Sequence, residues 1–110
     1  MKLVIVESPF RGKTLEQEKE NIEYAQACAR DCLMNHNEAP LLSHLLYTQE
    51  GILNDAIPEE RQLGIDAGLA WGLKAEATIV YTDLGISSGM EHGIANAVKA
   101  GRPIIYRLLY

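Results

Sequence analysis

The stretch ATIVYTDLGISSGMEHGIANAVKAGRPIIYR, which runs from Ala77 to Arg107, decides the predicted fold. Residues 78–81 form a short apolar run typical of a buried strand, and a turn rich in glycine and serine follows it. Apolar residues then recur three or four positions apart from Met90 to Val98, which predicts an amphipathic helix that ends at Gly101. Residues 103–106 predict the next strand. We therefore expect a strand–turn–helix–strand unit.

The rest of the chain continues this alternation. Residues 2–6 are almost entirely apolar, as in a central parallel strand, and a helix is expected from Thr14 to Met34. In a capping box, Thr14 would cap this helix and Gln17 would reach back to it. Residues 39–43 predict a lateral strand because they are short and contain proline, and Pro58 predicts the start of a further helix.

Strands and helices that alternate in this way imply a parallel sheet with right-handed crossovers. The predicted fold is a Rossmann-like α/β three-layer sandwich, with a sheet of about four strands in the order 2-1-3-4. A chain of 110 residues supports one domain, here residues 1–110. Helical spacing predicts which side chains are buried: Ile22, Ala25, Ala29, Cys32 and Leu33 in the first helix, and Leu63, Ala67, Ala70 and Trp71 in the next, with Ile65 and Leu69 on an adjoining face.

Composition excludes several classes of partner. The net charge is −5 and no basic run is present, which argues against binding to duplex nucleic acid. No apolar run approaches the roughly 20 residues that a membrane-spanning helix needs. Cys28 and Cys32 are expected to be buried, reduced thiols, and no cluster has the spacing of a metal site. We expect a cytoplasmic protein, in the host cytoplasm if a phage encodes it, with no cofactor.

The predicted strand order places a switch point between the first and third strands, where ligands of open parallel sheets bind. The loop after the first strand and the turn after the third open at this edge, where helix N-termini offer free N–H groups. Glu7, Lys13, Gln49 and Glu91 are expected at the same edge. The ligand-binding residues that we predict are Ser8, Pro9, Phe10, Arg11, His44, Tyr47, Asp83, Gly85, Ser87, Ser88, Gly89 and Met90.

Each of the main candidates has a structural alternative. The loop from Ser8 to Lys13 would cradle a phosphate or a ribose, with Arg11 or Lys13 neutralising charge, or would be an ordinary surface loop. It lacks the glycine and lysine spacing of a P-loop. Phe10 would stack on a base or cover the core. Tyr47 would contact a ligand or simply pack.

The acids and His44 also have two interpretations. Glu91 would act as a nucleophile on a sugar, or would close a capping box that begins at Ser88. Asp83 would bind ribose hydroxyls, with a possible catalytic part, or would cap a turn. His44 would contact a ligand or be a solvated or core side chain, and a pair with Ser43 is disfavoured because strand neighbours point to opposite faces.

Three blocks carry a resemblance to the nucleoside 2-deoxyribosyltransferase-like group of Rossmann-like proteins. They are residues 78–81, residues 90–97 and residues 101–105. The loop near the start of the chain that contains Ser8, Pro9 and Phe10 adds to this resemblance. The resemblance implies cleavage of N-glycosidic bonds with Glu91 as nucleophile. The group carries an acid six residues before that glutamate, where this chain has Gly85. The blocks SHLLYTQ and DLGISSGM also resemble small phage and bacterial proteins of this type.

Two functions follow as expectations. One is a binder of a nucleotide or nucleoside-derived molecule, such as a phage anti-defence sponge for an ADP-ribose derivative or a cyclic nucleotide. The other is an N-glycosidase or deoxyribosyltransferase that uses Glu91. A pocket on four strands is open on one side, so we expect a homodimer or higher oligomer, with Tyr47 and the loop 50–57 reaching across the interface.

Overall fold

The computed structural model describes all residues from Met1 to Tyr110. Strands and helices alternate along the chain, as the apolar pattern predicts. The elements are β1 (Lys2–Glu7), α1 (Leu15–Asn35), β2 (Glu38–Leu41), α2 (Ser43–Leu46), α3 (Pro58–Gly72), β3 (Ala77–Tyr81), α4 (Ser88–Lys99) and β4 (Ile104–Arg107).

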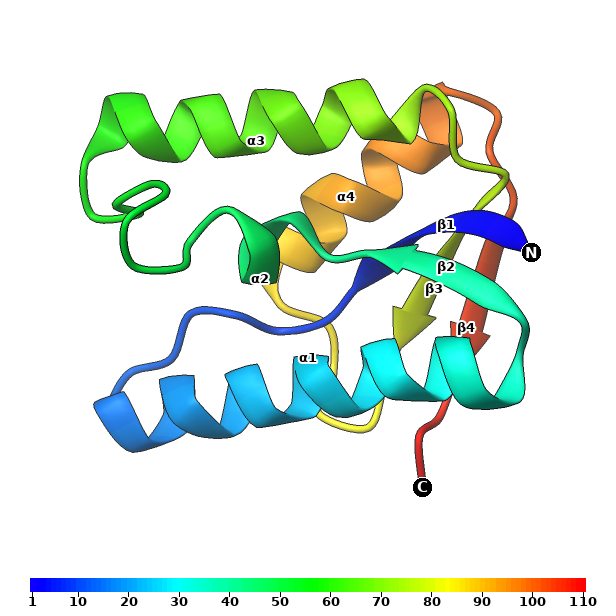
Figure 1. The fold of residues 1–110 in the computed structure, drawn as a ribbon, viewed down its shortest axis with the longest axis horizontal. Helices are drawn as coiled ribbons and strands as arrows, with labels where there is room; N and C mark the ends of the chain where they lie inside the picture. Colours follow the sequence, from blue (N-terminus) through cyan, green and yellow to red (C-terminus); the bar gives the residue numbers. More distant parts are fainter.

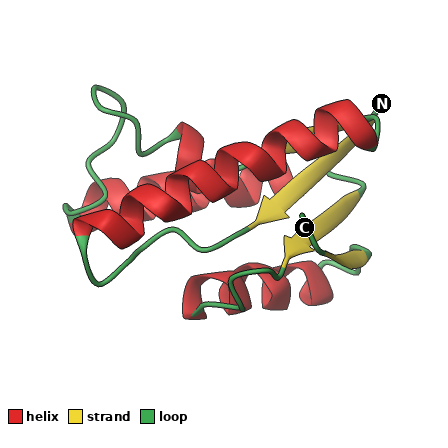
Figure 2. Cartoon of the chain, turned by 90° about the horizontal axis from the view of Figure 1, so that it is seen from below, coloured by secondary structure: helices red, strands yellow, loops and turns green.

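All four strands are parallel and lie in the order β2-β1-β3-β4, which confirms the predicted topology. Helix α1 covers one face of the sheet, and α3 and α4 lie on the other (Figure 1). Figure 2, seen from below, shows helices on both sides of the strands. This is the arrangement that right-handed crossovers produce when the chain moves outwards from β1 in both directions. The α/β Rossmann-like fold is therefore confirmed.

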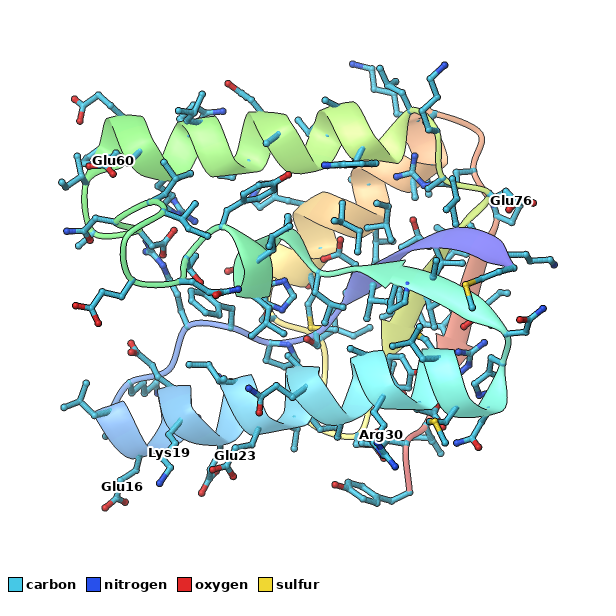
Figure 3. All side chains as sticks on the ribbon, viewed as in Figure 1. Glu16, Lys19, Glu23, Arg30, Glu60 and Glu76 are labelled. Atoms are coloured by element: carbon cyan, nitrogen blue, oxygen red, sulfur yellow. The ribbon has the colours of Figure 1, made fainter.

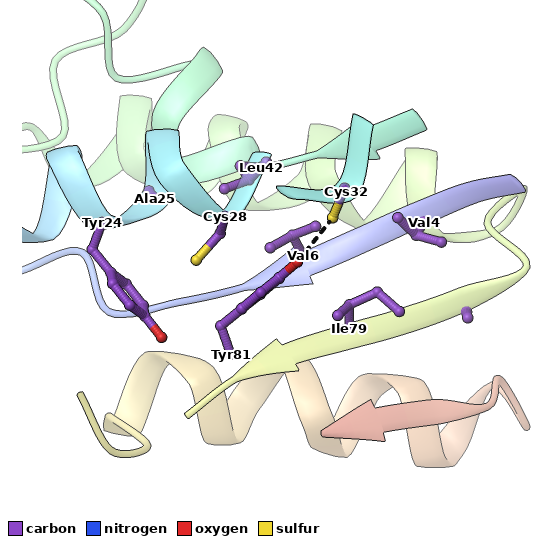
Figure 4. Close-up of a cluster of buried hydrophobic side chains, with 10 residues drawn as sticks. Val4, Val6, Tyr24, Ala25, Cys28, Cys32, Leu42, Ile79 and Tyr81 are labelled. Carbon is purple, nitrogen blue, oxygen red and sulfur yellow. Dashed lines mark hydrogen bonds between the residues drawn. The ribbon is translucent and has the colours of Figure 1, made fainter. Parts of the chain in front are cut away.

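The core lies between the sheet and α1. Val4, Val6, Ile79 and Tyr81 point from the two central strands towards Tyr24, Ala25, Cys28 and Cys32 of the helix (Figure 4). Both cysteines are free and fully buried, as predicted. Burial raises the pKa of Cys28 to about 12, which keeps this thiol protonated and unreactive at neutral pH.

The predicted buried stripe of α1 is partly wrong. Leu33 is about half exposed, whereas Asn21, Tyr24 and Cys28 are buried. The stripe is shifted because α1 turns its Tyr24 hydroxyl towards the end of β3, where it bonds Asp83. The outer face of α1 carries Glu16, Lys19, Glu23 and Arg30, which point to solvent (Figure 3).

The start of α1 follows its predicted signal, with one difference. The Thr14 side chain accepts a hydrogen bond from the Gln17 amide and caps the helix. The Gln17 side chain reaches back to the amide of Lys13, one residue before the cap. The cap therefore also fixes the end of the loop that leaves β1.

Helix α3 begins at Pro58 as predicted, but its contact face differs from the prediction. Leu63 and Trp71 are more than half exposed, and the helix contacts its neighbours through Gly64, Gly68 and Gly72. Glycine is required because the contact is close. A Cβ at Gly68 would lie 2.8 Å from the Ser43 Oγ of α2.

The segment after β2 is helical sooner than expected. The predicted strand 39–43 ends at Leu41, and Ser43 starts the short helix α2. Leu42, between them, is buried in the core. No helix of this chain is long and apolar enough to pass through a bilayer.

Candidate functional site

The carboxyl ends of β1 and β3 form the edge at which the sequence predicts a site. The two strands are parallel neighbours, and Glu7 at the end of β1 is paired in register with Val80 of β3. Helix α4 begins soon after β3 and passes close to the end of β1. A Cβ at Gly93 of α4 would overlap the carboxyl group of Glu7. The last residue of β1 therefore touches the first turns of α4.

Three predicted residues meet just beyond β1. The Ser8 hydroxyl lies 3.1 Å from His44 Nε2, and the Phe10 ring meets the His44 ring edge-on with centroids 5.5 Å apart. Burial lowers the pKa of His44 to about 4, so its imidazole is neutral at pH 7. Sequence reasoning considered and disfavoured a pair with Ser43. The structure pairs His44 with Ser8 instead, and Ser43 and His44 lie in helix α2 rather than in a strand.

The loop after Ser8 is held in place by α1 and by the segment that precedes α3. The Asn21 side chain donates to the carbonyl oxygens of Phe10 and Arg11. The Arg11 guanidinium donates to the Asp55 carboxylate and to its carbonyl, at 3.0 to 3.2 Å. Asp55 also lies 3.8 Å from Arg61. The charge that was predicted to meet a phosphate is therefore already paired with the loop 50–57.

Asp83 is engaged by its own protein. Its carboxylate accepts hydrogen bonds from the Tyr24 hydroxyl and from the amides of Leu109 and Tyr110. Burial favours its neutral form, but the hydrogen bonds from Tyr24 and from the two amides outweigh this effect and lower the pKa of Asp83. Of its two predicted roles, the contacts favour the structural one, in which Asp83 ties the segment after β4 to the end of β3.

The turn between Asp83 and α4 needs one glycine. Gly85 has a φ of +84°, a conformation that other residues adopt only with strain. Gly89, in the first turn of α4, is not required by packing, since a Cβ there would have only Ser87 Oγ at 4.0 Å. The backbone of the first turn is therefore open on this side.

The cap of α4 corrects a prediction. Ser87, not Ser88, is the N-cap, and its side chain accepts from the Met90 amide at 3.3 Å. The Met90 sulfur in turn accepts from the Ser87 amide, so the thioether takes the place that a glutamate usually has. The capping box with Glu91 is therefore wrong. Glu91 is exposed at the fourth position of the helix and takes no part in the cap.

Tyr47 lies at the end of α2 and faces α3. Its hydroxyl accepts a hydrogen bond from the Trp71 indole at 2.8 Å, and its Cβ packs against Gly64. These contacts favour the packing role over the ligand-contacting one.

Glu7 is the residue that sequence reasoning placed at the edge without giving it a role. Its side chain is largely buried, and neither a side chain nor a backbone amide donates to its carboxyl group. Burial raises the pKa of Glu7 to about 7, against the opposing pull of the Arg102 charge. An acid at the last position of an otherwise apolar strand was the signal that pointed to it.

The structure thus brings the predicted residues into two groups at one edge. After β1, His44 contacts both Ser8 and Phe10, and buried Pro9 lies between these two residues in sequence. Ser87, Ser88, Gly89, Met90 and Glu91 form the start of α4. No group of three or more His, Cys, Asp or Glu side chains is arranged to hold a metal ion.

Comparisons with known proteins agree with this fold. A solved structure of a 2-deoxyribosyltransferase from the psychrotolerant bacterium Bacillus psychrosaccharolyticus, described as a biocatalyst for nucleoside synthesis, superposes with a TM-score of 0.66. The match covers 96% of this chain and 72% of that one, at 15% sequence identity, so the likeness is one of fold. No curated protein matches the sequence. The family described as domain of unknown function DUF7768 matches residues 2–107, and this chain belongs to it.

Proposed function

We propose that this chain binds a nucleoside or a nucleoside-derived small molecule at the carboxyl edge of β1 and β3. The observation that carries the proposal is the contact between the two halves of this edge. Glu7 at the end of β1 meets α4 at Gly93, and the cluster of Ser8, His44 and Phe10 follows directly. Ligands of open parallel sheets bind at such switch points.

The chemistry of the edge suits a base joined to a sugar. Phe10 and His44 offer aromatic surface, and the neutral imidazole of His44 has both a donor and an acceptor nitrogen. The first turn of α4 adds unpaired backbone N–H groups beside Gly89. The likeness of fold to a 2-deoxyribosyltransferase supports the same ligand class.

Native mass spectrometry of freshly purified protein tests this proposal. The protein is then incubated with a panel of ribonucleosides, deoxyribonucleosides, their 5′-monophosphates, ADP-ribose and cyclic nucleotides, and the products are separated by chromatography. A bound member of this panel, recovered intact after heat release, supports a binder. If the panel contains no ligand that binds, the proposal is wrong.

Glu91 motivates a second candidate, which is cleavage of the N-glycosidic bond. Because Ser87 and Met90 cap α4 without it, the Glu91 carboxylate is free to act as a nucleophile. One of its oxygens would attack the anomeric carbon, and the electron pair of the broken C–N bond would leave with the base, which takes a proton from solvent. Water or a second base would then displace the carboxylate and restore Glu91.

Free base in the incubation would support the enzyme over the binder. We expect Glu91→Gln to bind the nucleoside as before and to release base at least 100-fold more slowly. Glu23→Gln, on the outer face of α1, is the matched control and is expected to behave like the wild type. Cleavage that survives in Glu91→Gln would remove Glu91 as the nucleophile.

A further inference from the structure

Glu7 differs from every other acid that is shielded at or beside the core. Asp31 accepts from Asn35 and Tyr81, Glu38 accepts two hydrogen bonds from Arg107, and Asp83 accepts three. Glu7 accepts none from the protein. A carboxyl group without donors is unfavourable in a shielded position, so this residue needs a reason beyond the fold.

The carboxyl group is not sealed inside the protein. No fully buried side-chain oxygen or nitrogen lacks a hydrogen-bond partner, so the unbonded oxygens of Glu7 retain contact with solvent. They reach it at the carboxyl end of a central strand, where the edge between β1 and β3 opens. The group is therefore shielded but not sealed, and it lies at the strand end where the site is proposed.

Helix α4 leaves space for this carboxyl group. Any side chain at position 93 would overlap it, and glycine in a helix interior is otherwise unfavourable. Gly93 has no positive φ that would explain its presence. The glycine is therefore explained by the carboxyl group that lies against it.

Of the two cations predicted to meet a phosphate at this edge, Arg11 is already engaged, whereas the Lys13 side chain forms no salt bridge. Arg11 is paired with Asp55. Arg102 lies before β4, towards the amino end of the sheet, and donates to the Thr78 hydroxyl and the Gly72 carbonyl. Gly93 is the sixth residue of α4, so Glu7 lies only about 7 Å along the helix from its first residue. Any phosphate bound at that first turn would meet the charge of Glu91 and, above pH 7 where Glu7 is ionised, the charge of Glu7 as well.

We propose that Glu7 is a ligand-contacting acid of this site, which accepts a hydrogen bond from a sugar hydroxyl and selects an uncharged nucleoside over its phosphorylated forms. The inference rests on the proposed function and names its substrate class. The sugar hydroxyl would be the hydrogen-bond donor to Glu7, which has none within the protein.

Titration calorimetry on the full chain at pH 8, above the pKa of Glu7, tests the proposal with matched pairs, namely the four deoxyribonucleosides and their 5′-monophosphates. We expect at least one nucleoside to bind tenfold or more tightly than its monophosphate. Glu7→Gln is expected to weaken nucleoside binding at least tenfold and to reduce the ratio of the nucleoside affinity to the monophosphate affinity. Glu23→Gln, whose side chain lies on the opposite side of α1 from the core (Figure 3), is expected to bind like the wild type.

A second variant moves the acid instead of removing it. Gly93→Ala keeps Glu7 but forces its carboxyl group aside, and is expected to lose affinity as Glu7→Gln does. Gly64→Ala, on α3, adds the same methyl group where it meets Leu53 and Tyr47 instead of Glu7, and is expected to retain affinity. Circular dichroism and thermal melts establish that each variant is folded at the temperature of the titration.

The outcomes separate this inference from the proposed function. Nucleoside binding that is unchanged in Glu7→Gln overturns the role of Glu7, and a wild type that prefers the monophosphate overturns the selection. In both cases the proposed function stands. If none of these eight compounds binds but another member of the wider panel does, this inference is wrong and the proposed function stands. If no member of that panel binds, both are wrong.

Discussion

Glu7 and His44 are two shielded titratable residues at one edge of the sheet, and burial shifts their pKa values in opposite directions. It raises that of Glu7 to about 7 and lowers that of His44 to about 4. Burial therefore disfavours the charged form of both side chains in the folded protein. The protein accepts a destabilising acid here, as binding sites commonly do.

The signs of these shifts predict the pH dependence of stability. The stability associated with neutral Glu7 is fully present below pH 4.5 and is lost as the pH rises to about 7, an effect of about 3 kcal/mol. The stability associated with neutral His44 is present above pH 6.5 and is lost as the pH falls to about 4. Between pH 4.5 and 6.5 the two effects oppose each other.

Glu7→Gln should therefore be more stable than the wild type at pH 8, by up to about 3 kcal/mol, and equally stable at pH 4. Its stability should also rise more steeply than that of the wild type between pH 4.5 and 6.5, because only the effect of His44 remains. Urea denaturation at five pH values measures both. Equal stability of the two proteins at pH 8 would show that Glu7 is not shielded as the structure indicates.

At the scale of the residue, sequence reasoning could place side chains but not pair them. Ser8 and His44 were both assigned to the edge, because strand ends in a parallel sheet share one side. Their hydrogen bond depends on where the short helix α2 turns, and no periodicity predicts a helix of four residues. The partners of Asp83 could not be predicted from the sequence either, because the amides of Leu109 and Tyr110 come from beyond β4.

At the scale of the element, the start of α4 shows how a local rule can be shifted by one residue. Two serines precede the helix, and the sequence rule favoured Ser88 because Glu91 follows it at the spacing of a capping box. The structure uses Ser87, since Met90 is buried and its sulfur lies against the Ser87 amide. Burial of Met90 therefore decided which serine caps the helix.

Two alanine variants test this cap. Ser87→Ala should cost about 1 kcal/mol of unfolding free energy, because the Met90 amide loses its acceptor. Ser88→Ala should change stability by less than about 0.5 kcal/mol, because Ser88 has no capping bond. Thermal or urea denaturation measures the difference. A larger loss in Ser88→Ala than in Ser87→Ala would restore the capping box that ends at Glu91.

Helix α3 shows a second limit of sequence patterns. Its residues were predicted to be helical, correctly, but large apolar residues surround the helix and do not mark one buried face. The actual contact face is made by the glycines, which let α2 approach closely. A rule that assigns burial to the largest apolar residues fails where packing depends on the smallest.

Matched glycine variants measure how close this packing is. Gly68→Ala places a Cβ 2.8 Å from Ser43 Oγ, so α2 must move and stability should fall by about 1–3 kcal/mol. Gly64→Ala meets the flexible end of Leu53 at 3.3 Å and the Tyr47 Cβ at an ordinary contact distance of 3.7 Å, so its gain in helix propensity should offset most of the cost. Denaturation of the two variants side by side checks the contrast. If both lose stability equally, the glycine contact does not set the distance between α2 and α3.

At the scale of the whole molecule, the topology was predictable because it depends on features that sequence shows directly. Four apolar runs alternate with helical segments, and the handedness of crossovers then limits the strand order. Whether the folded chain associates with another chain does not follow from such patterns. The surface of α3 raises this question, because the helix buries only Gly72 and leaves Leu63, Leu69, Trp71 and Leu73 substantially exposed.

We propose that the chain self-associates through α3. Ile65, Leu69 and Leu73 follow one another at helical spacing along one flank, and exposed apolar stripes of this kind mark interfaces in soluble proteins. A second copy is the occupant that we expect, because a symmetric dimer lets the same stripe meet itself. Size-exclusion chromatography with light scattering should then give at least twice the monomer mass of 12.2 kDa.

Charge on this flank should separate the subunits. Leu69→Glu combined with Ile65→Glu should shift the mass to 12.2 kDa while leaving circular dichroism unchanged, since both side chains are exposed in the single chain. Val98→Glu, at an exposed apolar position on α4, is the control and should keep the wild-type mass. A wild type that is monomeric at about 100 µM would exclude a dimer whose Kd lies below that concentration. If the Val98→Glu protein dissociates instead, the interface lies on α4. A second copy would then contact the helix whose first turns lie beside Glu7 and Glu91.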